Sequence, residues 1–174
     1  SASGVTIKNL TIKNANYNSW GGAIYFSSSA TSGTVSNCNF ADNKATGDGG
    51  AIYFDSTGTV SNCNFADNEA NYGGAVFFYD EGTVSNCNFT NNTASEDGGA
   101  VFFFDDGDVS NCNFTNNTAS EDGGAVYFNG KGDVANCNFV DNSASEGGAI
   151  FSMQWFTTAD TCIFKRNSGD NVNT

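Results

Sequence analysis

The chain has 174 residues, of which 19 are acidic, 6 are basic and none is histidine, so its formal net charge is −13 at pH 7. Nucleic acids and anionic membranes bind proteins through clustered basic side chains, and this composition excludes both as expected partners. No stretch reaches the about 20 apolar residues of a membrane-spanning helix, so we expect no direct insertion into a membrane. The abundance of Ser, Thr, Asn and Gly is typical of exported proteins and predicts an extracellular or cell-surface location.

The first segment with a regular pattern covers residues 5–12. Its apolar residues have the spacing of β-strands, at Val5, Ile7, Leu10 and Ile12. The tetrapeptide Asn-Leu-Thr-Ile at residues 9–12 imitates a motif that returns along the chain with cysteine in the place of leucine. We therefore predict β-strands from the start of the sequence.

Two motifs then repeat along almost the whole chain. Gly-Gly-Ala, followed by Ile or Val and an aromatic residue, begins at Gly21, Gly49, Gly73, Gly98, Gly123 and Gly147. Asn-Cys-Asn-Phe, or a variant of it, recurs every 24 or 25 residues, with its cysteine at Cys38, Cys63, Cys87, Cys112, Cys137 and Cys162. Such a period is typical of a solenoid, in which each coil buries its apolar face only against its neighbours. We predict one solenoid domain over residues 1–174, with about seven coils of 24–25 residues.

Each coil contains two clear strand patterns. Cys112 and Phe114 alternate with asparagines, which is the period of a half-buried strand with cysteine and phenylalanine inside. Val109 lies three residues before Cys112, so a bend is expected between them if both point inward. The apolar run at residues 100–104 is too short for a helix and rich in β-formers, and it predicts a second strand.

Two solenoid families fit these patterns. The spacing Val-x-x-Cys-x-Phe-x-x-Asn-x-Ala in residues 109–119 matches the leucine-rich repeat, where an asparagine ladder closes the strand. That fold then needs a helical or extended convex segment with its own apolar spacing. Gly-Gly-Ala-Val-Phe-Phe at residues 98–103 is poor helix material, which favours an all-β, single-stranded parallel β-helix.

A second repeated motif strengthens this interpretation. Phe-x-x-Asn occurs at Phe40/Asn43, Phe65/Asn68, Phe89/Asn92, Phe114/Asn117, Phe139/Asn142 and Phe164/Asn167. Together with Gly-Gly-Ala-Ile/Val, it resembles the repeats of chlamydial polymorphic outer-membrane proteins and of the adhesin-like surface proteins of methanogenic archaea. The resemblance covers nearly the whole chain and implies a right-handed parallel β-helix, display on a cell surface and adhesion. It transfers no catalytic residue.

The repeated asparagines and cysteines are interpreted as structural. We expect the asparagine of each Phe-x-x-Asn motif to join a ladder of stacked amides, with a turn that caps its own backbone as the alternative. The cysteines lack metal-ligand spacing and histidine partners, so we predict a column of buried, inert thiols without disulfides. Several asparagines lie in Asn-x-Ser/Thr sequons and are candidate acceptors of N-linked glycans: Asn88, Asn91, Asn113 and Asn116, with a further sequon at Asn9.

Acidic residues recur just before the Gly-Gly pair. Asp97, Asp122 and Glu146 are aligned at this position, and like charges at one coil's spacing repel. Calcium could bridge them through carboxylate oxygens, which makes them weak calcium candidates. The alternative is a solvated acidic face whose repulsion is screened by salt. No run of residues forms a dedicated calcium loop, so we expect no metal and no cofactor.

The aromatic residues after Gly-Gly-Ala form two ranks. If the Ile or Val points inward, the residue two positions later is also core, at Phe26, Phe54, Phe78, Phe103 and Phe128. The residues between them would form an outward, exposed stripe that binds a partner: Tyr25, Tyr53, Phe77, Phe102, Tyr127 and Phe151. The alternative is a strand rotated the other way, with the stripe inside the core.

Taken together, these patterns predict a non-enzymatic structural or adhesin-like protein, a surface rod that displays an interaction face to a cell-surface glycan or protein. The rival class is a carbohydrate-active β-helix, whose acids would cluster outside the repeat. An ice-binding solenoid would need two regular threonine ranks, and the one rank turns acidic at Asp108.

The first coil has two lysines and no acid before Asp42, so we also expect head-to-tail stacking of copies into a filament, with a fragment of a longer rod as the alternative.

Overall fold

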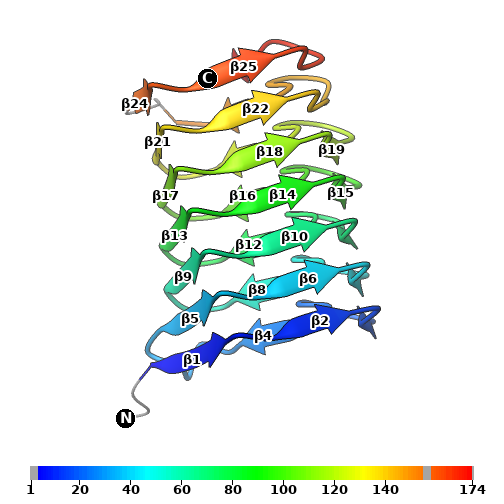
Figure 1. Cartoon of the computed structure of the whole chain (residues 1–174), viewed down its shortest axis with the longest axis vertical. Coiled ribbons are helices and arrows are strands. Elements are labelled where there is room, and N and C mark those ends of the chain that lie inside the picture. Colours follow the sequence, from blue (N-terminus) through cyan, green and yellow to red (C-terminus); the bar gives the residue numbers. More distant parts are fainter. Residues whose placement is uncertain (1–3, 155–157, 174) are drawn as a thin grey trace.

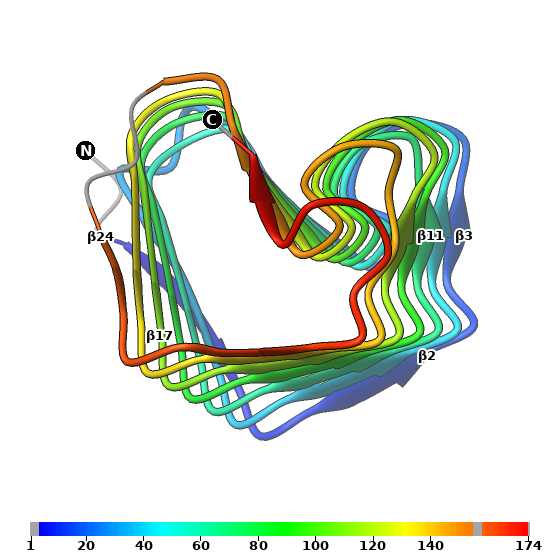
Figure 2. The same ribbon diagram turned by 90° about the horizontal axis from the view of Figure 1, so that it is seen from above.

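The protein is a stack of short parallel β-strands, as a computed structural model that describes residues 4–154 and 158–173 shows (Figure 1). Strands at the same place in successive coils pair with one another and form four parallel sheets. Figure 2 is viewed along the stack and shows the successive coils lying over one another with similar outlines. The predicted all-β parallel β-helix of about seven coils is confirmed. Among the described residues, no helix has the length and apolar character needed to cross a membrane.

The four sheets, which we name A to D, follow one another around each coil. Sheet A contains β1 (Val5–Lys8), β5 (Gly33–Ser36), β9 (Gly58–Ser61), β13 (Gly82–Ser85), β17 (Gly107–Ser110), β21 (Gly132–Ala135) and β24 (Thr158–Asp160). Sheet B contains β2 (Thr11–Lys13), β6 (Asn39–Ala41), β10 (Asn64–Ala66), β14 (Asn88–Thr90), β18 (Asn113–Thr115), β22 (Asn138–Val140) and β25 (Ile163–Lys165). Sheet C contains β3 (Asn16–Tyr17), β7 (Lys44–Ala45), β11 (Glu69–Ala70), β15 (Thr93–Ala94) and β19 (Thr118–Ala119). Sheet D contains β4 (Ile24–Phe26), β8 (Ile52–Phe54), β12 (Val76–Phe78), β16 (Val101–Phe103), β20 (Val126–Phe128), β23 (Ile150–Ser152) and β26 (Val172–Asn173).

Equivalent residues of neighbouring coils pair directly. In sheet A, Val84 pairs with Val60 on one side and with Val109 on the other. A slip of one residue would turn every inward side chain outward, so the apolar faces fix this register. The same residue type therefore stands above itself along the stack.

The central core consists of stacked columns of phenylalanine. Neighbouring rings in sheets B and D are nearly parallel, with centroids 4.7–5.1 Å apart. The sheet D column contains Phe26, Phe54, Phe78, Phe103 and Phe128, all of which are buried. This confirms the prediction that these rings belong to the core.

The expected bend between Val109 and Cys112 lies at Asn111. Its φ of 53° is in the left-handed region, which asparagine tolerates better than most residues because its short side chain bonds locally. The same corner recurs at Asn37, Asn62, Asn86, Asn136 and Thr161. The bend turns the chain from sheet A to sheet B, so both Val109 and Cys112 face the core.

The Gly-Gly pair forms a tight corner before the strand of sheet D. Gly98 has a φ of 65°, and a Cβ atom on Gly99 would lie 2.1 Å from the carbonyl oxygen of Gly124 in the next coil. Real Cβ atoms do not approach backbone that closely, so the corner requires glycine. The chain then enters strand β16, and the leucine-rich-repeat alternative is wrong because this segment is a strand of sheet D.

The predicted asparagine ladder is present at the corner between sheets B and C. The Asn92 side chain donates to the Phe65 carbonyl at 3.1 Å and to Asn117 Oδ1 at 3.0 Å, and its own Oδ1 accepts two N–H groups of Asn68. The ladder continues through Asn43, Asn68, Asn92, Asn117, Asn142 and Asn167. Its amides satisfy backbone groups that the corner removes from the sheets.

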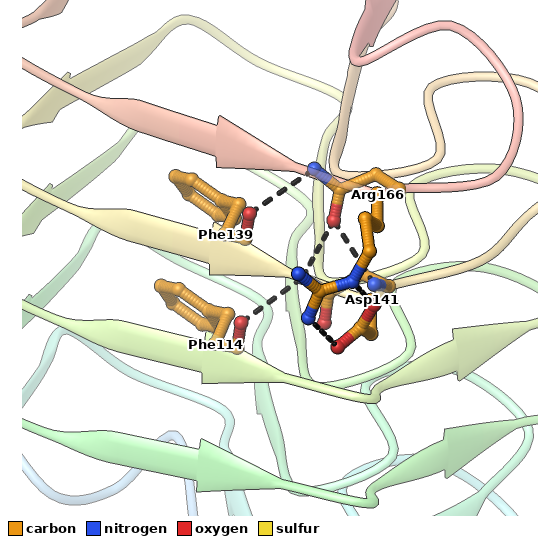
Figure 3. A network of polar contacts seen from close by, with 6 residues as sticks. Phe114, Phe139, Asp141 and Arg166 are labelled. Atoms are coloured by element: carbon orange, nitrogen blue, oxygen red, sulfur yellow. Dashed lines mark hydrogen bonds and ion pairs between the residues drawn. The ribbon is translucent and has the colours of Figure 1, made fainter.

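The last coil adds an ion pair beside this ladder. Figure 3 shows the carbonyl groups of Phe114 and Phe139, which accept hydrogen bonds from the last two ladder asparagines at 3.0 and 3.1 Å. The Arg166 guanidinium lies on Asp141 next to them, with Nη2 and Oδ2 2.6 Å apart, and holds the pKa of Asp141 below its ordinary value.

A second ladder on the outer face of sheet B was not predicted. Asn88 Nδ2 donates to Asn64 Oδ1 at 2.8 Å, and the pattern repeats across Asn39, Asn64, Asn88, Asn113 and Asn138. These amides are exposed except at the last position, which is half-buried, so water competes for their bonds. The signal was the asparagine between cysteine and phenylalanine, which alternates with these inward residues.

The cysteine column is buried as predicted over five coils, and Cys162 is half-buried. The Cys87 thiol donates to the Ser85 carbonyl at 3.1 Å and accepts the Cys63 N–H at 3.4 Å. Burial raises the pKa of the Cys162 thiol.

We expect a thiol reagent to label Cys162 first and the other cysteines only after unfolding, as followed by mass spectrometry. We also expect Cys87→Ala to cost about 1–3 kcal/mol of unfolding free energy. Rapid labelling of Cys87, or disulfides in the native protein, would contradict this prediction.

Candidate interaction groove

The predicted aromatic stripe lies on the outer side of sheet D, separate from the central core. Contrary to the prediction, the middle rings of the stripe are buried. Tyr53, Phe77, Phe102 and Tyr127 form a second buried cluster with only 5–6 % of their surface exposed. Tyr25, at the first coil, is 44 % exposed, and Phe151 is half-buried. For the four rings of the buried cluster, the prediction that they point away from the central core was therefore right, and the prediction that they are exposed was wrong.

Two contacts bury the stripe. Its rings stack on one another, with centroids 4.6–5.0 Å apart from Tyr53 to Tyr127, so each ring covers the faces of its neighbours. The segment between sheets C and D also folds back against them. Tyr72 from this segment meets Phe102 edge to face at 5.4 Å, and a Cβ atom added to Gly98 would lie 3.2 Å from the Phe102 Cβ atom. Burial raises the pKa of Tyr127 to about 12, so its phenol stays neutral.

A groove remains between this folded-back segment and the residues that follow sheet D. Its volume is about 440 Å³, and it is lined by Trp20, Asp48, Tyr53, Tyr72, Phe77, Tyr79, Phe102 and Phe104. We call it the aromatic groove. Trp20, Tyr79 and Phe104 are 46–50 % exposed, so the groove presents aromatic surface to solvent. The buried stripe forms its floor.

The exposed rings come from positions that break the repeat. Trp20, Asp48 and Tyr72 occupy the same place before successive Gly-Gly pairs, and the Asp48 and Tyr72 carbonyls each accept a glycine N–H from the coil before at 2.9 Å. Tyr79 and Phe104 follow strands β12 and β16 and stack on each other at 4.9 Å. The corresponding residue of the preceding coil is Asp55, and that of the following coil is Asn129. These departures were the signal in the sequence that could have located the groove.

Acidic residues surround the same rings. Asp48 lies inside the groove. Burial raises its pKa to about 6, although a hydrogen bond from the backbone N–H of Tyr72 acts in the opposite direction. A neighbouring hollow of about 490 Å³ shares Tyr79 and Phe104 and is also lined by Asp55, Asp80, Asp105 and Asp106. We call it the acidic hollow. Among the described residues that line the groove and the acidic hollow, none is basic.

The calcium candidates lie in one rank beyond the aromatic groove. The Asp122 N–H donates to Asp97 Oδ1 at 3.0 Å, and Asp122 forms a parallel bridge with Glu146. Burial raises the pKa of Asp97 to about 6, so it carries less charge than a free carboxylate near neutral pH. Within the described part of the chain, no three His, Cys, Asp or Glu side chains form a group that could hold a metal ion. The expected absence of a bound metal stays a prediction.

Another hollow lies on sheet A. It has a volume of about 470 Å³, and its charged lining residues are Glu81, Asp106, Asp108, Lys131 and Asp133. Burial, and then the charges of Asp133 and Asp106, raise the pKa of Asp108. These acids follow the repeat, and Lys131 offsets part of their charge. The hollow has no exposed aromatic ring in its lining.

The sequon asparagines are exposed but hydrogen-bonded. Asn88 and Asn113 belong to the outer ladder on sheet B, where the Asn113 amide donates to Asn88 at 2.9 Å. Asn91 and Asn116 lie at left-handed corners, and the Asn116 amide donates to Asn91 at 2.9 Å. A glycan on any of them would replace one of the two hydrogens of its side-chain amide. Their glycosylation stays a prediction.

The comparisons with known proteins agree with this architecture. The family model described as the right-handed β-helix region matches residues 1–172. No curated protein and no solved structure matches the chain. Because the family match extends over almost the whole sequence, and the strands wind as parallel coils, the chain belongs to the right-handed β-helix family.

Proposed function

We propose that the chain is a non-enzymatic, extracellular β-helix that displays the aromatic groove as its interaction site, in the manner of an adhesin-like surface protein. The observation that carries this proposal is the exposure of Trp20, Tyr79 and Phe104 at the rim of a groove with a rigid, stacked floor. Exposed aromatic surface of this kind is enriched at sites of protein and ligand contact.

The absence of catalysis is part of the proposal. General acid and base groups need separated environments that push their pKa values apart. Burial is the main cause that raises the pKa of both Asp48 and Asp97 to about 6, so these two acids do not form a pair with separated pKa values. Most acids recur with the coil, which suits a uniform surface better than a single reaction centre.

The experiment is a binding screen with a charge-neutral double variant, Tyr79→Ser/Phe104→Ser. Both rings are half exposed, so we expect the fold to survive, and far-ultraviolet circular dichroism checks this. The matched control is Tyr17→Ser, which removes a 56 % exposed ring of sheet C outside the groove. Immobilised glycans, peptides and cell surfaces serve as targets.

We expect the double variant to lose at least about tenfold in affinity for any target that the parent and the Tyr17→Ser control retain, since aromatic anchors dominate binding energy. Equal binding by all three proteins would place the interaction elsewhere. Turnover of a glycan that disappears when one acid is replaced would instead favour the carbohydrate-active alternative.

Sedimentation of the same proteins checks the prediction that copies stack end to end.

A further inference from the structure

We propose that the aromatic groove and the acidic hollow together bind an extended peptide segment rich in lysine or arginine, whose cationic side chains lie against the exposed rings between the carboxylates. This inference rests on the proposed function, because it assigns the partner of the same groove. It is drawn from charge complementarity and from the position of the two hollows, which share the rings of Tyr79 and Phe104 in their linings.

The first step is the placement of Asp48 between aromatic residues. Along the folded-back segment, its coil lies between the coil of Trp20 and the coil of Tyr72. Among the described residues, no basic side chain forms an ion pair with Asp48. A half-buried carboxylate flanked by aromatic rings is suited to a cation, because the carboxylate supplies charge and ring faces attract cations.

The second step is the pair Tyr79 and Phe104. These two rings line both the groove and the acidic hollow, so a ligand that covers them faces Asp48 on one side and Asp80 and Asp105 on the other. The chain contains no Lys or Arg between residues 45 and 130. An anionic glycan would be repelled at this place, and a neutral glycan would leave the carboxylates without a charged partner.

The third step favours a peptide over a single amine. The two hollows have volumes of about 440 and 490 Å³ and adjoin at the shared rings of Tyr79 and Phe104, so a single ammonium group would fill only part of one. Carboxylates lie on both sides of the rings, which calls for several cations on one ligand. Side chains on one face of an extended peptide repeat every about 6.6–7 Å, which allows successive cations to reach both hollows.

The probe is a fluorescent octapeptide of alternating lysine and glycine, titrated into the folded protein and followed by anisotropy at low and high salt. The same peptide with acetylated lysines removes the charge and keeps the length. A neutral β-linked glucosamine-type oligosaccharide with acetylated amines tests for a sugar ligand. Each titration uses the parent protein and three variants.

The variants separate the groove from the general negative charge of the protein. Asp48→Asn removes one charge inside the groove, and Asp67→Asn removes one charge at an exposed corner where other coils already carry asparagine. Tyr79→Ser/Phe104→Ser leaves the charge unchanged. We expect the groove variants to weaken binding about tenfold each and Asp67→Asn to have less than about a twofold effect.

The acetylated peptide should bind at least about tenfold more weakly than the lysine peptide. Equal weakening by Asp48→Asn and Asp67→Asn, or binding that is insensitive to the ring substitutions, would overturn the inference and indicate unspecific attraction. If the oligosaccharide binds through Tyr79 and Phe104 while the lysine peptide does not, the cationic partner is wrong and the groove remains the interaction site. If neither the lysine peptide nor the oligosaccharide binds, the inference is overturned, and the binding screen described above decides the proposed function separately.

Discussion

Replacing Asn92 by alanine should lower the unfolding free energy by about 4 kcal/mol. The side chain is fully buried and makes two donor and two acceptor hydrogen bonds in the inner ladder. Its removal leaves the Phe65 carbonyl and the Asn68 N–H groups without these partners, and each buried unsatisfied group costs about 1–3 kcal/mol. Denaturant unfolding followed by circular dichroism measures the loss.

The matched control is Asn88→Ala in the outer ladder. Its amide donates to Asn64 at 2.8 Å and accepts from Asn113 at 2.9 Å, but it is exposed to water. We expect this variant to lose less than about 1 kcal/mol, because water replaces the missing bonds. Equal losses for the two variants would show that the inner ladder owes nothing to burial.

The second large effect is expected for Gly99→Ala. The new Cβ atom would lie 2.1 Å from the Gly124 carbonyl oxygen and 2.7 Å from the Thr118 carbonyl carbon, both of them backbone atoms of the next coil. The coils would have to separate locally, and the loss should be about 3 kcal/mol or more. The midpoint of denaturant unfolding is the measurement.

Gly4→Ala is the control for this change. The nearest atom to its new Cβ is the Ser32 hydroxyl oxygen, which can rotate away. We expect less than about 1 kcal/mol of destabilisation, since only a flexible side chain must move. A Gly99→Ala protein as stable as the parent would mean that the Gly-Gly corner is looser than the structure places it.

The repeat made most of the fold predictable. Cys112 and Phe114 point inward because alternation along a strand has only two phases, and the apolar phase faces the core. The bend at Asn111 followed from the spacing of Val109, and the inner ladder followed from the asparagine of Phe-x-x-Asn. These features recur in successive coils after the first, where Leu10, Ile12 and Ala15 replace the cysteine, phenylalanine and ladder asparagine, so one coil predicts the next.

The burial of the stripe could not be predicted in the same way. Whether Phe77 and Phe102 are exposed depends on how the segment before Gly-Gly folds back over sheet D, which is a contact between parts of the coil rather than a strand pattern. Consequently, Phe102→Ser is expected to destabilise the protein. The residues that do face solvent, such as Tyr79, break the repeat, so the candidate site lies where the periodic pattern fails.

The most direct measurement of the central claim, that this groove is the interaction site, is an experimental structure of the chain with the lysine-glycine octapeptide bound. We predict peptide density over Tyr79 and Phe104, with ammonium groups near Asp48 and the carboxylates of the acidic hollow. Peptide bound on sheet A beside Asp108 and Asp133, or along the edges of the end coils, would contradict the account.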